Sequence, residues 1–303
     1  MKSVRKLIAL FLVLVLALSL SACGGFAGKM AKAASRMQKL QSLRMDLNID
    51  VGLSMSLFGE ALDLDMLLSG PAEVIHSPLK AKASFTMNMM EETLDTLCYL
   101  EKSGDKILTY LSPDNGKTWT KTETGASGLP ETGGIDSKSL AGLAKLSSSF
   151  QEAGTETVRG SEAVVYSGTL SAADLESVLD IPTMLKSIET ATGTKLDEDA
   201  LDFSSVSPTP IVLCLDKKSG MLVKTSIDMT GLMQVMMPVV MDTAIKSALD
   251  AGGLGGLAGL DPGMLGLECN FSRLIVTVVF YDFDSVGEIT IPPDALAAKA
   301  ITA

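Results

Sequence analysis

Few residues in this sequence are of the types that carry covalent chemistry. The 303 residues include one histidine, His76, and four cysteines. General acid–base and nucleophilic mechanisms most often place a histidine beside a nucleophile or a carboxylate. No Ser-His-Asp, Cys-His or paired-carboxylate set can be assembled from the pattern, and a multi-histidine metal site is excluded by composition. We therefore predict that the protein is not an enzyme and needs no metal or cofactor.

Two pairs of aspartates could suggest a calcium site, namely Asp63 with Asp65 and Asp282 with Asp284. However, an Asp-x-Asp pattern on a strand places both side chains on its wet face, and no EF-hand spacing follows either pair. We interpret both pairs as solvated. His76 is expected in a turn at 75–78, where it is also solvated.

Three cysteines, Cys98, Cys214 and Cys269, lie in apolar, strand-like contexts. In an oxidising compartment two of them could form a disulfide and leave one thiol over. The alternative is that all three are small buried apolar residues, and we favour this interpretation.

The N-terminus has the layout of a secretory signal. Basic residues at 2, 5 and 6 precede an apolar run at 7–20, which is shorter than a membrane span. The run ends in Leu20-Ser21-Ala22-Cys23, which resembles the lipobox of bacterial lipoproteins. That resemblance implies cleavage before Cys23 and a diacylglycerol on its thiol. An ordinary signal peptide with a chance cysteine is the alternative.

A lipid on Cys23 would hold the protein on the extracytoplasmic side of the cell membrane. We predict a signal peptide at 1–22, a lipidated tether at 23–27, one domain at 28–295 and a tail at 296–303. The formal net charge of −11 repels anionic lipid headgroups, so the acyl chains must supply the attachment. The same charge excludes a nucleic-acid binder held by phosphate contacts.

Long amphipathic strands dominate the rest of the chain. Apolar residues alternate with polar ones over 45–57 and again over 62–68, which predicts a long hairpin with one apolar face. Further strands are expected at 79–89, 94–101, 106–112, 154–159, 162–170, 210–215, 221–229, 268–283 and 286–291. Short polar turns between successive strands indicate an antiparallel meander.

Helical periodicity is confined to a few segments. We expect amphipathic helices at 28–43, at 137–150, from Ser171 onward and at 231–249, where Pro238 should kink or divide the helix. Together with the strands they predict an α+β fold, in which the helices cover the apolar face of the sheet.

Several short signatures accompany this layout, among them Val164-Val165-Tyr166 before Ser171 and Leu215-Asp216-Lys217 before Gly220. With the Cys23 motif, the chain resembles a family of uncharacterised lipoproteins of monoderm bacteria. More distantly it is similar to the superfamily of LolA, LppX and LprG. The resemblance implies an antiparallel β half-barrel with helices on its concave face, and acyl chains held between the two. It implies no ligand-contact residue.

A hydrophobic cavity is consistent with the residues themselves. Cavities for acyl chains have apolar linings, and methionine, of which the chain has 17, adapts to variable apolar ligands. We expect the protein to bind a lipid or another hydrophobic ligand there. The expected lining is Leu47, Ile49, Val51, Leu53, Met55, Leu64, Met66, Met87, Met89, Met236 and Met237. The alternative is a cell-envelope interaction or structural lipoprotein with a filled core.

Two motifs are interpreted as loops. Residues 112–119, Ser-Pro-Asp-Asn-Gly-Lys-Thr-Trp, resemble one Asp-box of a sialidase propeller. That motif recurs in each blade, and Asp-Asn-Gly is by itself a strong turn sequence. The Leu129–Gly133 segment spells a sortase signal but lacks the apolar stretch and basic tail that should follow it.

Overall fold

A computed structural model gives the fold of most of the chain. It describes residues 25–57, 60–90, 92–125, 137–179, 201–250 and 268–302, together with single positions between 181 and 196. Cys23, the Leu129–Gly133 segment and the glycine-rich segment at 251–263 lie outside the described residues.

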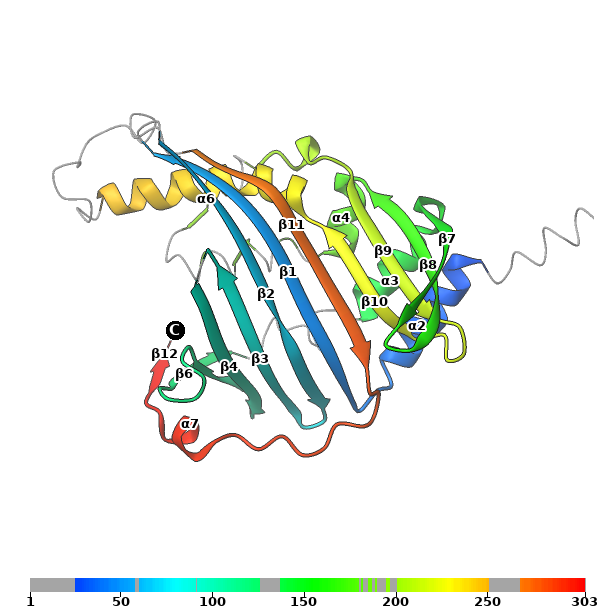
Figure 1. Ribbon diagram of the computed structural model, residues 1–303, viewed down its shortest axis with the longest axis horizontal. Coiled ribbons are helices and arrows are strands. Elements are labelled where there is room, and N and C mark those ends of the chain that lie inside the picture. Colours follow the sequence, from blue (N-terminus) through cyan, green and yellow to red (C-terminus); the bar gives the residue numbers. More distant parts are fainter. Residues whose placement is uncertain are drawn as a thin grey trace, which may run out of the picture.

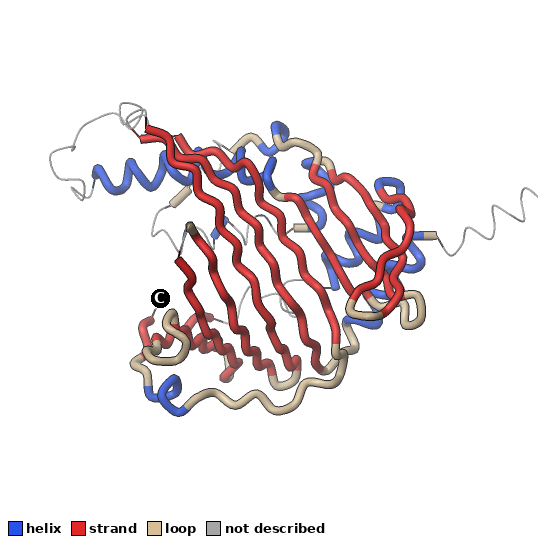
Figure 2. Tube along the Cα trace, in the orientation of Figure 1, coloured by secondary structure: helices blue, strands red, loops and turns tan. Residues whose placement is uncertain are grey.

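One twelve-stranded sheet organises the described residues (Figures 1 and 2). Its strand order is β12-β6-β5-β4-β3-β2-β1-β11-β10-β9-β8-β7, and neighbours are antiparallel except β12 and β6. The strands are β1 (Ser42–Leu57), β2 (Glu60–His76), β3 (Leu79–Met89), β4 (Glu92–Ser103), β5 (Lys106–Ser112), β6 (Thr120–Gly125), β7 (Phe150–Val158), β8 (Ser161–Leu170), β9 (Thr209–Asp216), β10 (Leu222–Asp228), β11 (Glu268–Tyr281) and β12 (Ala300–Thr302).

The described helices lie mainly behind the sheet as it is drawn in Figure 1. They are α2 (Phe26–Met37), α3 (Ser137–Lys145), α4 (Ala172–Val178), α6 (Thr230–Asp250) and α7 (Pro293–Ala297). Among the described residues, no helix is both long enough and apolar enough to span a membrane. The predicted α+β fold, an open antiparallel half-barrel with helices on its concave face, is confirmed.

Period-two alternation places apolar side chains of the central strands on one face. Met45 of β1 lies opposite Ala72 of β2 and Phe280 of β11, and Leu47 lies opposite Val278. The intervening positions carry Arg44 and polar residues to the other face. The sheet therefore has an apolar concave face for the helices and a charged outer face.

The main core lies between the concave face and the helices. Helix α2 buries Met30, Ala33 and Met37 against it, and Phe26 at its start stacks on Phe150 with ring centroids 4.3 Å apart. This packing also brings α2 beside α3.

A second, smaller core lies on the outer face. Pairing across β1 to β4 puts Tyr99 on the same face as Arg44. Tyr99 is nevertheless buried, because Tyr110, Ile289, Ile291 and Ala295 pack with it. The chain after β11 thus returns along the outer side of the sheet to supply the last three of these residues.

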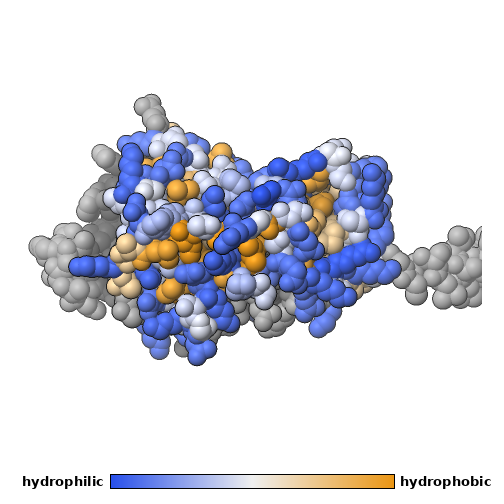
Figure 3. Space-filling model, turned by 90° about the horizontal axis from the view of Figure 1, so that it is seen from below, coloured by the Kyte–Doolittle hydropathy of each residue, from blue (hydrophilic) through white to orange (hydrophobic). Residues whose placement is uncertain are grey.

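Seen from below, apolar side chains gather over the half of the molecule that holds β2 to β6, between hydrophilic margins (Figure 3). The opposite half, where β7 to β9 lie, is mostly hydrophilic in the same view. The two ends of the sheet therefore present surfaces of different character on this side.

Several predicted elements differ from the structure. The predicted strand at 286–291 is wrong, because this segment pairs with no strand and instead buries Ile289 and Ile291 in the smaller core. The helix predicted to reach residue 43 ends at Met37, and Leu43 belongs to β1.

Three further details concern the ends and interiors of elements. Pro238 lies inside α6, which continues on both sides of it and is not divided. The helix predicted at 137–150 ends at Lys145, and Phe150 begins β7. Residues 300–302, which were expected in a tail, form β12 and pair with β6.

Candidate functional site

A cavity of about 450 Å³ lies between the concave face and the helices. Its lining comes from β1, β2, β3, β9, β10 and β11 on the sheet side and from α3 and the end of α4 on the other. The lining residues are Met45, Leu47, Ala72, Val74, Ala81, Phe85, Leu140, Leu143, Val178, Leu179, Leu213, Leu222, Thr225, Ile227, Met229, Val276, Val278 and Phe280.

The cavity is almost wholly apolar. Among the described lining residues, Thr225 supplies the only side-chain hydroxyl, and it is buried. Such a wall provides almost no hydrogen-bond partners for an ionised or strongly polar group, and burying such a group without partners costs several kcal/mol. Its volume is about three times that of an engineered apolar cavity of roughly 150 Å³ that binds benzene.

Small residues on neighbouring strands leave the space open. Ala72 of β2 lies between Met45 of β1 and Ala83 of β3, and Val74 pairs with Ala81. Ala72 and Ala81, on adjacent strands, form a floor of the cavity where larger residues would reduce the space below the helices. The helices carry leucines over this floor, at Leu140 and Leu143 of α3.

One predicted lining residue, Leu47, lies in the wall of this cavity. Eight others share its face but continue beyond the cavity along β1, β2 and β3, where Val51 pairs with Met66 and Met66 with Met89. They are Ile49, Val51, Leu53, Met55, Leu64, Met66, Met87 and Met89. These eight do not line this cavity.

The two predicted residues of the methionine-rich helix belong to the core. Met236 of α6 is fully buried and Met237 is half-buried against the main core. Their helix packs along β11. The methionine content of α6 therefore contributes to packing, and neither residue lines the cavity.

The sequence interpretation missed most of the lining. Val276, Val278 and Phe280 lie in an almost continuously apolar stretch of β11, so the sequence indicates a strand here but not which of its side chains face the cavity. The leucines of α3 and the floor alanines carry no signal of their role either, because it depends on which strands and helices meet.

Three of the four aspartates considered for metal binding are occupied by structural contacts. Asp65 accepts a hydrogen bond from Arg273 at 2.9 Å, and Asp282 accepts one from Arg44 at 2.9 Å. Asp284 accepts the backbone N–H of Gln41 at 2.6 Å. Among the described residues no cluster of His, Cys, Asp and Glu could hold a metal ion.

The three cysteines of the described residues are free thiols, but of the three buried residues favoured from the sequence only Cys214 is buried, and Cys98 and Cys269 are half-buried. Burial raises the pKa of Cys214 to about 12, and Glu156 adds to this by accepting a hydrogen bond from Sγ at 3.1 Å. Burial also raises the pKa of Cys98 and of Cys269. Because the thiolate is the reactive form, all three are poor nucleophiles at neutral pH.

Comparison with known proteins gives a family. The model of a family of unknown function, DUF6612, matches residues 29–250. The chain belongs to DUF6612. The prediction of an uncharacterised family is thereby confirmed, and no curated protein matches the chain.

Solved structures similar to this DUF6612 protein include a lipoprotein, LprF and a lipoprotein-sorting domain. The Mycobacterium tuberculosis lipoprotein LppX has 15% identity and a TM-score of 0.43, with 87% of this chain and 97% of that chain covered. LprF from Mycobacterium bovis has 12% identity and a TM-score of 0.42, with 88% and 96% covered. A putative outer membrane lipoprotein-sorting protein domain from Vibrio parahaemolyticus has 10% identity and a TM-score of 0.21, with 86% and 95% covered.

Proposed function

We propose that this protein is a non-enzymatic, membrane-anchored extracytoplasmic lipoprotein that binds a lipid acyl chain or a hydrophobic molecule of similar size. The observation that carries the proposal is the apolar cavity of about 450 Å³ between sheet and helices. This volume lies within the range of roughly 300–1,000 Å³ that is usual for small-molecule sites.

The chemistry of the lining supports a hydrocarbon ligand. Burial of apolar surface contributes roughly 25 cal/mol per Å², and none of the lining residues that the structure describes carries a charge. A ligand with a polar end would have to leave that end outside the lining or direct it to Thr225.

The proposed anchor places the ligand site close to a source of lipid. Helix α2 begins at Phe26, three residues after Cys23, and three extended residues span at most about 10 Å. A diacylglycerol on Cys23 would therefore keep the half-barrel beside the membrane surface.

Binding of a fluorescent apolar probe, N-phenyl-1-naphthylamine, to the chain from residue 24 onward tests the cavity. This chain contains every described residue. We expect saturable binding of one probe per protein. In the variant Ala81→Phe an added ring occupies the floor, and we expect at least a tenfold loss of affinity, about 1.4 kcal/mol.

The matched control is Ala153→Phe, the same exchange at an exposed position of β7 outside the lining. It should bind the probe as the parent does. Circular dichroism verifies that both variants fold. If the parent shows no saturable binding, and native mass spectra and organic extracts show no bound lipid, the protein has a filled core and acts by surface contacts instead.

The anchor is tested separately in cells. Cys23→Ala should move the protein from the membrane fraction to the culture medium or leave an uncleaved precursor, and it should abolish labelling by a radioactive fatty acid. Cys98→Ala, a change at a half-buried cysteine, is the control and should leave labelling unchanged. Lipid labelling that persists in the Cys23→Ala protein would refute the anchor.

A further inference from the structure

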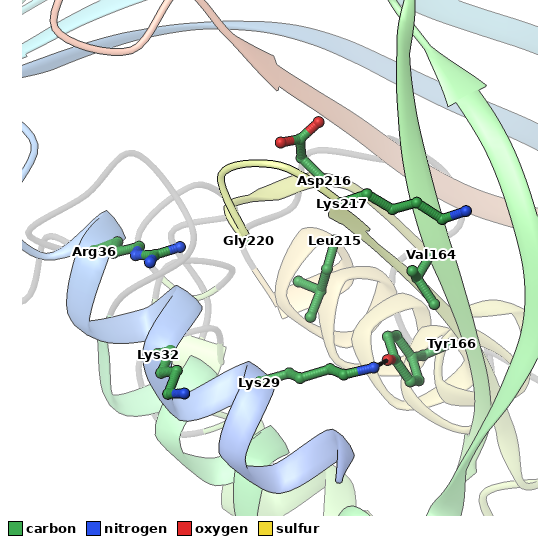
Figure 4. A pocket seen from close by; sticks show the side chains of 9 residues that line it. All are labelled: Lys29, Lys32, Arg36, Val164, Tyr166, Leu215, Asp216, Lys217 and Gly220. Carbon is green, nitrogen blue, oxygen red and sulfur yellow. Dashed lines mark hydrogen bonds between the residues drawn. The ribbon is translucent and has the colours of Figure 1, made fainter. Parts of the chain in front are cut away.

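A second pocket, of about 230 Å³, lies between α2 and the strands β8 and β9 (Figure 4). Four cationic side chains line it, Lys29, Lys32 and Arg36 from α2 and Lys217 from the turn after β9. Val164 and Leu215 add an apolar wall. Such a concentration of positive charge is unexpected in a chain with 25 basic and 36 acidic residues.

Two of the four cations already have partners. Lys29 Nζ donates a hydrogen bond to the hydroxyl oxygen of Tyr166 at 2.6 Å and lies 3.8 Å from Glu152. Lys217 forms an ion pair with Glu162. The Tyr166 bond also raises the pKa of Lys29, so this amine stays charged throughout the neutral range.

The other two cations make no ion pair or side-chain hydrogen bond within the described part of the chain. These are Lys32 and Arg36, which stand one turn apart on the same side of α2. In Figure 4 the guanidinium of Arg36 extends from α2 toward the turn that contains Gly220. Both positive charges are therefore available to a ligand.

Gly220 allows the guanidinium to approach the turn. A Cβ at this position would lie 2.8 Å from Arg36 Nη1, and φ is +63°, a conformation that favours glycine. Any larger residue at position 220 would push Arg36 out of its place. The absence of a side chain at Gly220 thus leaves room for the Arg36 guanidinium beside the turn.

The one acidic residue of the lining, Asp216, is engaged on its own hairpin. Its carboxylate accepts hydrogen bonds from the Ser161 and Ser219 side chains and from the backbone N–H of Lys218 and of Ser219. Figure 4 shows it pointing away from the cations of α2. Asp216 thus holds the turn and leaves Lys32 and Arg36 of the helix uncompensated.

We propose that this pocket binds an anionic phosphate group, presented by a phospholipid headgroup or by a soluble phosphate ester. Arginine and lysine are the residues that recognise phosphate oxygens, arginine with paired N–H donors and lysine as a point charge. The apolar wall at Val164 and Leu215 fits the carbon side of an ester. The site itself rests on the described residues, whereas a lipid source rests on the proposed anchor at Cys23.

The first experiment measures binding of inorganic phosphate and of glycerol 3-phosphate to the chain from residue 24 onward by calorimetry at low salt. We expect saturable binding with one site and about a tenfold loss of affinity in Lys32→Ala/Arg36→Ala. The control, Lys39→Ala/Lys218→Ala, changes the net charge equally at two exposed lysines outside the lining and should bind as the parent does.

A second arm distinguishes the two sources of phosphate. Co-sedimentation with phosphatidylglycerol vesicles, compared with phosphatidylcholine vesicles, should depend on Lys32 and Arg36 if the headgroup is the ligand. Binding of glycerol 3-phosphate without vesicle binding assigns the site to a soluble ester. The proposal would be overturned if the parent bound neither the soluble phosphate compounds nor the vesicles. It would also be overturned if the pocket and control variants lost the same affinity.

The outcome is independent of the hydrophobic cavity. Lys32→Ala/Arg36→Ala should retain the affinity for N-phenyl-1-naphthylamine, since neither residue lines that cavity. A failure of the cavity proposal would show as lost or absent probe binding with phosphate binding intact. A failure of the anchor proposal would appear only in the cellular labelling and fractionation of Cys23→Ala.

Discussion

Asp114 illustrates how one side chain can organise a turn. Its carboxylate accepts hydrogen bonds from the Ser112 hydroxyl and from the backbone N–H groups of Lys117 and Thr118, and its second oxygen accepts the Thr118 hydroxyl at 2.7 Å. Asn115 and Gly116 both take positive φ. The segment that resembles an Asp-box is therefore a turn between β5 and β6, as its sequence predicts, and the backbone N–H of Asn115 also donates to the carbonyl of Asp95 in β4.

These hydrogen bonds, that of the Thr118 backbone first, lower the pKa of Asp114 from 3.8 to about 2. Because the folded state favours the carboxylate, its stabilising contribution is fully present above pH 4. It is lost as the pH falls toward 2. We expect Asp114→Asn to lower the melting temperature at neutral pH and to differ less from the parent as the pH falls below 4.

Thermal unfolding followed by circular dichroism between pH 2 and pH 7 measures this difference. The control is Asp105→Asn at an exposed turn. A melting-temperature difference for Asp114→Asn that stays constant down to pH 2 would contradict the assignment.

At the same scale, three arginines form ion pairs with carboxylates that are far from them in the sequence. Arg44, Arg159 and Arg273 look scattered along the chain, yet each bonds a carboxylate of the sheet's outer face, at Asp282, Asp46 and Asp50. Arg159 also lies over the Tyr281 ring, 3.6 Å from its centroid. The pairing depends on strand register, which residue types alone do not determine.

Among the elements, α4 begins where the local sequence predicts it, at Ser171. Ser171 accepts the backbone N–H of Asp174 at 3.3 Å, and Asp174 accepts the backbone N–H of Ser171 at 2.9 Å, forming a capping box. We expect Ser171→Ala to lower the unfolding free energy by about 1 kcal/mol. Urea unfolding measures the change, and Ser148→Ala, an exposed serine outside α4, should leave it within about 0.5 kcal/mol. An equal effect of both substitutions would argue against the cap.

The hairpin of β2 and β3 contains a tighter constraint. A Cβ on Gly70 would lie 1.9 Å from the backbone carbonyl oxygen of Ser84, so no side-chain movement could relieve the clash. We expect Gly70→Ala to destabilise the fold by at least about 2 kcal/mol. Gly287→Ala, where a Cβ meets nothing within 4 Å, is the control for the added methyl group.

Urea midpoints with unchanged slopes would measure this loss directly. If Gly70→Ala unfolds at the same urea concentration as the parent, the close approach of β2 and β3 at this point is incorrect. A parallel loss in Gly287→Ala would indicate a general effect of replacing glycine instead.

The elements that could be predicted are those with a strong period. Alternation in 45–57 and 79–89 was sufficient to predict β1 and β3. The segment at 286–291 alternates only over Ile289-Thr290-Ile291, and these isoleucines pack with Tyr99 and Tyr110 rather than beside a strand partner. Periodicity indicates which side chains are buried. Only the tertiary structure shows which residues they pack against.

For the whole molecule, the position of the cavity was the least predictable feature. The alternating residues identify the apolar face, and Leu47 does line the cavity. Which part of that face stays open depends on where α3 and α4 rest and where small residues such as Ala72 and Ala81 align on adjacent strands. These are relations between distant segments. The predicted methionines of β2 and β3 therefore lie on the neighbouring part of the face.

Two cores on opposite faces of one sheet predict that stability and ligand binding can be separated. Ile289 is buried in the outer core with Tyr99 and Tyr110 and is remote from the cavity lining. Ile289→Ala should lower the unfolding free energy by about 2–4 kcal/mol, because it removes buried methylenes and leaves a void. Its affinity for N-phenyl-1-naphthylamine, measured well below the unfolding transition, should equal that of the parent.

Ala81→Phe should show the opposite pattern, with a large loss of probe affinity and a smaller change in unfolding free energy. Urea unfolding and probe titration of both variants, on the same preparations, give the four values needed. If Ile289→Ala weakens the probe as strongly as Ala81→Phe, the outer core supports the shape of the cavity through the sheet. The two faces would then form one cooperative unit, and hydrophobic ligands should in turn protect the outer core from unfolding.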